Sequence, residues 1–248
     1  MVGSHAVAKN KKKAKKPSGS ARIRDFDLRP GRILAGKYEV IGRLGRGWEG
    51  EVYHLRELAT GIERAAKLFY PHRDRGLKTS RRFAMKLHKL RHCSMLIQYH
   101  GQESISYRGC QVPILISEFV EGELLSDFLR RQPGRRLPPF QALHLLHALC
   151  VGIMEIHSAG EYHGDLHSEN VIVQRVGLGF DLKLVDLLHW DEGKREARQD
   201  DVVGLIEIFY EALGGAKHYA RLPRAVKRIC CGKRRTLILK KFRKVHHL

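Results

Sequence analysis

The sequence predicts an α+β fold in which a strand-rich first lobe is followed by a helix-rich second lobe, with a cleft between them. Short apolar and β-branched runs dominate positions 37–120, where only positions 77–91 have the period of a helix. After residue 120 the long periodic segments are helical and the strand-like runs are short. The chain has 248 residues, 43% of them hydrophobic, which suffices for one good core or for two small lobes. We therefore expect a domain over 31–248, with lobes at about 37–120 and 121–248.

Strands and one helix are expected in the first lobe. The helix at 77–91 carries Phe83, Leu87 and Leu90 on a single stripe, as one buried helix face requires. Apolar runs predict strands at 38–44, 51–55, 62–70 and 111–119.

Helices are expected to dominate the second lobe. Pro139 suits the first turn of a long helix, and Gly160 lies just past its end. Two glycines at 214–215 would stop another helix. The patterns predict helices at 124–131, 139–157, 200–213, 222–231 and 237–245, and strands at 171–174 and 182–185.

The chain is strongly basic, with a formal net charge of +20, which favours polyanionic partners. Residues 1–30 combine lysines with small, turn-forming residues, so we expect a disordered basic tail. The stretch after residue 220 is also basic and contains no acid. Each end either binds nucleic acid or another anionic surface, or is a solvated face, and the sequence leaves both interpretations open.

Five cysteines without a C-x-x-C spacing fit reduced thiols. The N-terminus lacks the apolar stretch of a secretory signal, and no apolar run approaches the roughly 20 residues of a membrane span. These features predict a cytoplasmic protein with no transmembrane segment.

A glycine-rich segment between two predicted strands is a candidate phosphate-binding loop. Gly45, Gly47, Gly50 and Val52 form the pattern G-x-G-x-x-G-x-V. Glycine backbone can fold closely over phosphates and offer N–H donors. A plain hairpin turn explains a lone match about as often. A dinucleotide-binding fold is disfavoured, because a strand follows where that fold requires a helix.

Lys67 lies on the next predicted strand, flanked by apolar residues from Ala65 to Leu68. We expect its ammonium group to point into the cleft and contact phosphates. The alternative is an edge lysine that extends to water.

Three further polar residues end or precede short strands. Asp165 and Asn170 lie in a loop that runs into the strand at 171–174. A carboxylate can orient or deprotonate an attacking hydroxyl, and an amide oxygen can hold Mg²⁺. Asp186 ends the strand at 182–185 and could share that Mg²⁺ with Asn170. A turn or helix cap is the commoner role for any single aspartate.

Together these motifs resemble, in order and spacing, the signature set of protein kinases over residues 37–213. The resemblance implies a two-lobed protein kinase-like fold with ATP and Mg²⁺ as cofactors. Its implied site residues are the loop Gly45–Gly50, Val52, Ala65 and Lys67 for the nucleotide, Asp165 as catalytic base, and Asn170 and Asp186 as metal ligands. It also implies that the backbone of Glu118 to Val120 binds adenine, that Ser117 is a small gatekeeper, and that Asp201 braces the loop at Asp165.

The chain departs from that family's pattern in several places. The helix at 77–91 carries no glutamate to pair with Lys67, and Phe83 lies near the expected position. We expect Lys67 to pair with Asp186 or with the nucleotide alone. The usual D-F-G reads Asp186-Leu187-Leu188, and the segment to Asp201 is short. The few residues after position 215 predict a shortened helical lobe.

The leading assignment is an ATP- and Mg²⁺-dependent Ser/Thr protein kinase that transfers the γ-phosphoryl group to a hydroxyl. The form His163-Gly164-Asp165 is similar to that of small-molecule and lipopolysaccharide kinases, so a sugar or other small hydroxyl substrate is the first alternative. The second is a pseudokinase binding module, because the missing helix glutamate is expected to weaken catalysis.

Overall fold

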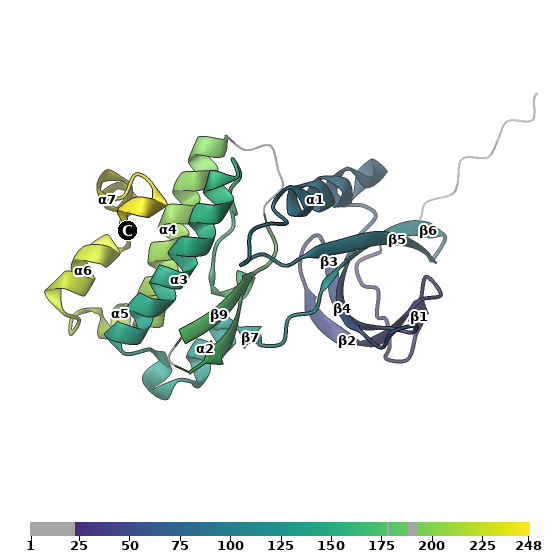
Figure 1. Ribbon diagram of the computed structural model, residues 1–248, viewed down its shortest axis with the longest axis horizontal. Helices are drawn as coiled ribbons and strands as arrows, with labels where there is room; N and C mark the ends of the chain where they lie inside the picture. The colour runs from purple at the N-terminus through teal and green to yellow at the C-terminus, as the bar shows by residue number, and fades with distance from the viewer. Residues whose placement is uncertain (1–22, 178, 188–192) are drawn as a thin grey trace, which may run out of the picture.

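A six-stranded antiparallel sheet forms the first lobe in the computed structural model, which describes residues 23–177, 179–187 and 193–248 (Figure 1). The strand order is β1-β2-β3-β4-β6-β5. The strands are β1 (Ile33–Leu34), β2 (Tyr38–Arg46), β3 (Gly50–Glu57), β4 (Glu63–Phe69), β5 (Tyr99–Tyr107) and β6 (Cys110–Glu118). Four of them confirm the strands expected from apolar runs. The edge strand β5 was not predicted, because it alternates exposed polar residues with half-buried ones over most of its length.

Helix α1 (Lys78–Lys89) lies between β4 and β5 in the chain and packs on the sheet, as the 77–91 periodicity predicts. Its buried face includes Phe83, Ala84 and Leu87. Phe83 meets Phe69 of β4 edge to face, with ring centroids 6.2 Å apart. Aromatic pairs in this arrangement stabilise a core beyond the area that they bury.

The chain enters the first lobe earlier than the sequence indicates. Ile23, Phe26 and Leu28 are buried against the sheet. The backbone N–H of Phe26 donates to Glu51 at 3.2 Å, and its carbonyl accepts from the hydroxyl of Tyr107 at 2.6 Å. The expectation of a disordered tail through residue 30 is therefore wrong for 23–30, where apolar side chains alternate with charged ones and can be buried. The rest of that predicted tail, 1–22, lies outside the described residues.

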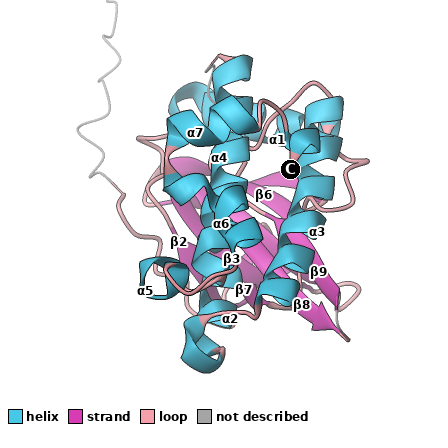
Figure 2. Cartoon of the chain, turned by 90° about the vertical axis from the view of Figure 1, so that its left-hand side faces the viewer, coloured by secondary structure: helices cyan, strands magenta, loops and turns pink. Residues whose placement is uncertain are grey.

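The second lobe consists mainly of helices, with a small sheet of order β7-β8-β9 beside α3 (Figures 1 and 2). The long helices α3 and α4 lie side by side at its centre. The elements are β7 (Glu123–Leu124), α2 (Leu125–Arg131), α3 (Pro139–Ser158), β8 (Val171–Val176), β9 (Gly179–Leu184), α4 (Lys194–Ala212), α5 (Gly215–Tyr219), α6 (Arg224–Cys230) and α7 (Arg235–Lys241). The helices after α4 are short, as expected of a compressed lobe. Helix α4 begins six residues before the predicted 200, because its first turns are polar and carry no apolar period.

Helix α3 is long and apolar enough, on length and composition alone, to cross a membrane. Among the described residues it is the one helix that meets this criterion. Leu145, Leu149, Ile153 and Ile156 of this helix are fully buried in the core of the second lobe. Because core helices of this kind meet the same criterion, the finding is weak support for a membrane span.

Candidate active site

A cleft of about 520 Å³ lies between the lobes and collects most of the predicted site residues. Its volume is within the range of sites that bind small molecules and cofactors. The predicted residues that line it are Gly45, Gly47, Gly50, Val52, Lys67, Asp165, Asn170 and Asp186. Positions more than 100 residues apart in the chain therefore meet around one space.

The glycine-rich loop (45–50) joins β2 to β3 over this cleft. The N–H of Gly47 donates to the carbonyl of Gly50 at 2.9 Å and closes a tight turn. A Cβ at Gly50 would lie 1.9 Å from the carbonyl oxygen of Leu68, so this glycine is needed for β3 to pair closely with β4. A Cβ at Gly45 or Gly47 would meet nothing within 4 Å, so these two leave open space in front of the backbone. Gly50 therefore permits close strand pairing, whereas Gly45 and Gly47 keep the space in front of the loop open.

Lys67, on β4, extends into the cleft and lies between two carboxylates. Its Nζ is 2.7 Å from Oδ1 of Asp186 and 3.1 Å from Oε2 of Glu49. Burial by itself would lower the pKa of Lys67, but the two carboxylates together raise it above the ordinary value. The ammonium is therefore held in its charged form inside the cleft.

The position of the missing helix glutamate is occupied by an aromatic ring. Nζ of Lys67 lies 4.8 Å from the ring centroid of Phe83 on α1, within range of a cation–π contact. The carboxylate that sequence reasoning missed is Glu49, in the glycine-rich loop itself. The expected pairing with Asp186 is present, and Glu49 adds a second partner. The available signal was an acid directly before the last glycine of the motif.

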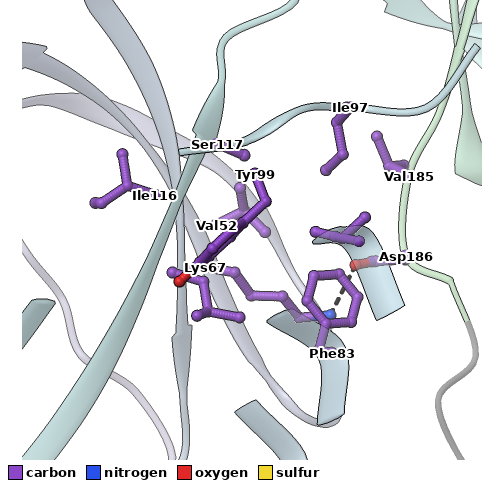
Figure 3. A pocket seen from close by; sticks show the side chains of 11 residues that line it. Val52, Lys67, Phe83, Ile97, Tyr99, Ile116, Ser117, Val185 and Asp186 are labelled. Atoms are coloured by element: carbon purple, nitrogen blue, oxygen red, sulfur yellow. Dashed lines mark hydrogen bonds and ion pairs between the residues drawn. The ribbon is translucent and has the colours of Figure 1, made fainter. Parts of the chain in front are cut away.

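A smaller cavity of about 80 Å³ opens behind Lys67 (Figure 3). Figure 3 shows Lys67 joined to Asp186 at its edge, with apolar side chains from both lobes around it. Ser117 lines this cavity, and its gatekeeper role stays a prediction. The other lining residues are Val52, Phe83, Leu87, Ile97, Tyr99, Leu115, Ile116 and Val185.

The loop at 162–170 is held in place by a buried carboxylate of helix α4. Asp201 of α4 is fully buried and accepts the backbone N–H groups of His163 at 2.9 Å and Gly164 at 2.7 Å. Nε2 of His157 lies 2.8 Å from the same carboxylate. Asp201 therefore lies where the expected bracing role requires. Gly164 has φ +86°, a backbone conformation that is strained for any residue with a side chain.

His163 joins this loop to the strand that carries Asp186. Its side chain is fully buried, and burial lowers its pKa below the ordinary value, which favours the neutral imidazole. Nε2 lies 3.0 Å from the carbonyl oxygen of Val185, and Nδ1 accepts the backbone N–H of Asp165 at 3.3 Å. One neutral ring can satisfy both contacts, with the proton on Nε2. His163 thereby fixes the backbone on both sides of the cleft floor.

Asp165, Asn170 and Asp186 present oxygen atoms to the cleft. Nδ2 of Asn170 donates to the carbonyl of Asp165 at 2.8 Å, so the oxygen Oδ1 is the atom of this amide that suits a cation. The side chains of Asp165 and Asp186 are 58% and 45% exposed, which leaves them accessible. Asp186 has φ +53°, a costly backbone conformation for a residue with a side chain and typical of functional sites. Carboxylate and amide oxygens fit Mg²⁺, which takes its other ligands from water and phosphate.

The predicted adenine contacts are less closely associated with the cleft. Ala65, Glu118 and Val120 are not among the residues that line either cavity described above. The N–H of Glu118 donates to the carbonyl of Gln98 at 2.9 Å, and its carboxylate lies 2.8 Å from Lys183. Contact of these three residues with a base therefore stays a prediction.

His167 is a further cleft residue, to which the sequence analysis assigns no role. Its Nε2 lies 2.9 Å from Nδ2 of Asn170 and 3.7 Å from Oδ2 of Asp165. Its position two residues after the aspartate was the available signal. Nδ1 of the ring accepts the backbone N–H of Glu169 at 3.3 Å, which fixes the ring within this loop.

Comparison with known proteins agrees with this geometry. The profile of the family described as "Protein kinase domain" matches residues 38–207, more than half of the chain. The serine/threonine-protein kinase pkn2 of Myxococcus xanthus is 34% identical over 157 residues, which cover 62% of this chain and 18% of that protein. A probable serine/threonine-protein kinase of Streptomyces coelicolor is 30% identical over 150 residues, covering 59% of this chain and 22% of that protein. The chain thus matches about a fifth of the length of these relatives.

The kinase domain of PknI from Mycobacterium tuberculosis is similar in structure, with a TM-score of 0.63. The superposition covers 88% of this chain and 94% of the PknI domain at 18% sequence identity. At this identity the likeness shows the fold, and it confirms the predicted two-lobed arrangement.

Proposed function

Because this chain belongs to the protein kinase domain family, we propose that it is an ATP- and Mg²⁺-dependent phosphotransferase, and specifically a Ser/Thr protein kinase. The observation that carries the proposal is the convergence of Lys67, Asp165, Asn170 and Asp186 on one cleft beneath the glycine-rich loop. Phosphoryl transfer depends mainly on positioning and on neutralising charge, and these residues supply both.

Each residue has a task that its position supports. The ammonium of Lys67 and the N–H groups of the glycine-rich loop would hold phosphate oxygens. Asn170 and Asp186 would hold Mg²⁺, which when bound neutralises charge on the phosphates. The carboxylate of Asp165 would accept a hydrogen bond from the acceptor hydroxyl and then its proton. The hydrogen bonds from Asp201 keep the loop that carries Asp165 in place.

A protein substrate is favoured over a sugar or other small hydroxyl compound. The names of the similar bacterial proteins describe Ser/Thr protein kinases, which supports this choice. The sequence His163-Gly164-Asp165 is the feature that supports a small-molecule substrate instead.

Incubation with γ-labelled ATP and Mg²⁺, with mixed protein substrates or with small hydroxyl compounds, tests the proposal. We expect label on Ser and Thr side chains, and loss of transfer in Asp165→Asn with nearly unchanged nucleotide affinity. Asp127→Asn is a matched control, because Asp127 is an exposed aspartate of α2 that pairs with Arg130. Transfer by Asp165→Asn at the unaltered rate would contradict the role of Asp165. Nucleotide binding without transfer to any acceptor would favour a pseudokinase.

We also propose that the basic ends bind an anionic polymer such as nucleic acid. Ten lysine and arginine side chains after residue 220 are exposed: Arg221, Arg224, Arg228, Lys233, Arg234, Arg235, Lys240, Lys241, Arg243 and Lys244. Contacts to phosphates would make affinity fall steeply with salt. A flat salt dependence, measured with and without residues 1–22, would contradict this proposal.

The five cysteines are free thiols, which supports the proposal of a cytoplasmic location.

A further inference from the structure

We infer that Glu49 is the positioning residue for Lys67, and that it replaces the missing glutamate of helix α1. The orientation of the phosphate-binding lysine would then depend on the base of the glycine-rich loop and not on α1. This inference rests on the proposed function, because it concerns how Lys67 is presented to a nucleotide.

The exposure of the two carboxylates separates their roles. The side chains of Lys67 and Glu49 are 12% and 11% exposed, whereas that of Asp186 is 45% exposed. Attraction between opposite charges is stronger when both are withdrawn from water. Glu49 is therefore suited to remain with Lys67, while Asp186 stays available to a cation in the cleft.

Helix α1 cannot supply this partner. Its segment Lys78–Lys89 contains no aspartate or glutamate, and the side chain that it directs at Lys67 is the ring of Phe83. The ring limits where the ammonium can lie, but it offers no carboxylate oxygen. The acid of the first lobe that contacts this ammonium is Glu49. It precedes Lys67 in the sequence, whereas α1 follows it.

The backbone of Glu49 is held by the sheet, which lets its side chain act as a fixed support. Its carbonyl accepts the N–H of Tyr70 at 2.8 Å. The next residue, Gly50, lies so close to Leu68 that a side chain would not fit. Glu49 therefore lies at the anchored base of the loop, whereas Gly45 and Gly47 face open space.

Helix α1 packs on the sheet and also contacts the second lobe. Lys89 forms an ion pair with Glu161, which also lies 3.3 Å from Lys194. Nζ of Lys86 lies 3.8 Å from the ring centroid of Tyr162. Because α1 contains no acid, it cannot form an ion pair with Lys67. The carboxylate that orients Lys67 therefore comes from the glycine-rich loop.

A double-mutant cycle tests the inference. We expect Glu49→Gln and Lys67→Met each to weaken the binding of Mg·ATP about 10-fold, measured by isothermal titration calorimetry. The double variant should bind no more weakly than Lys67→Met alone, because Glu49 acts through Lys67. Glu49→Asp, which keeps the charge but shortens the reach, should lie between. Glu207→Gln is the matched control, since Glu207 forms an exposed pair with Lys233 far from the cleft.

Transfer of the carboxylate to α1 provides a second test. In the Glu49→Gln background, Phe83→Glu would place an acid beside Lys67 from the helix side. We expect at least a threefold recovery of Mg·ATP affinity in this double variant, with folding checked by thermal denaturation of each protein. A folded double variant without recovery would overturn the inference, and so would wild-type affinity in Glu49→Gln or additive losses in the cycle.

The outcomes also separate this inference from the proposed function. If the wild-type protein binds Mg·ATP but transfers no phosphate while the cycle behaves as expected, the proposed activity fails and the role of Glu49 stands. If transfer occurs and Glu49→Gln is unaffected in both binding and kcat/KM, the activity stands and the role of Glu49 fails.

Discussion

Replacement of Gly50 by alanine should destabilise the protein, whereas the same change at Gly45 or Gly47 should not. An added Cβ at Gly50 would lie 1.9 Å from the carbonyl oxygen of Leu68 and 3.0 Å from Cα of Phe69. Both atoms belong to the backbone and cannot rotate away, so β3 and β4 must separate locally. Overpacking costs about 1–3 kcal/mol, and a weakened ladder hydrogen bond costs about 1 kcal/mol more. We therefore expect a loss of about 3 kcal/mol in the free energy of unfolding.

Thermal and urea denaturation of the nucleotide-free protein would measure this loss. For a domain of this size, about 3 kcal/mol corresponds to a fall in Tm of about 6–12 °C. Gly45→Ala and Gly47→Ala should stay within about 0.5 kcal/mol of the wild type, because nothing lies within 4 Å of the added Cβ. Their cost should appear instead as weaker binding of Mg·ATP. Equal stability of Gly50→Ala and Gly45→Ala would refute the reasoning.

Three further changes have expected outcomes. Asp201→Asn should lower the free energy of unfolding by about 3 kcal/mol in urea titrations, since an amide NH₂ would face backbone N–H groups that now donate to a buried carboxylate. Phe26→Ala should cost about 3 kcal/mol by the same measurement, because its ring is fully buried, while Ile33→Ala, at an exposed position, serves as the control and should cost little. Burial lowers the pKa of Lys86 from 10.5 to about 8. Between these pH values Lys86 is protonated in the unfolded chain but mostly neutral in the folded protein, so stability should rise with pH across this window. The rise, roughly 1–3 kcal/mol, should be absent in Lys86→Met, and equal pH profiles for the two proteins would contradict it.

The fold and most of the cleft could be predicted because their signals are local. Glycines at fixed spacing and a lysine within an apolar run are visible in a short window. So are an aspartate and an asparagine before a β-branched strand. The strands and helices that carry these groups follow from the period of apolar residues. The structure brings Lys67, Asp165, Asn170 and Asp186 to one cleft, as the motifs predict.

What the sequence did not reveal depends on contacts between distant segments. Glu49 becomes the partner of Lys67 only because pairing of β3 with β4 brings the two side chains together. Residues 23–28 looked like part of a polar tail, since their three apolar side chains are separated by charges. Their burial follows from a sheet surface that forms elsewhere in the chain. Strand β5 was missed because exposed polar residues alternate with half-buried ones over most of its length, and its buried apolar residues, Ile105 and Tyr107, come only near its end.

The docked segment at 23–28 affects how the domain can be cut from its chain. The family match begins at residue 38, and a fragment started there would look complete by sequence comparison. It would nevertheless uncover the apolar surface beneath Phe26 and deprive the carboxylate of Glu51 of a buried N–H donor. Exposed apolar patches of this kind promote aggregation. Recombinant versions should therefore start upstream of Ile23, and poor solubility of shorter ones would reflect a missing piece of the lobe rather than an inherently unstable kinase domain.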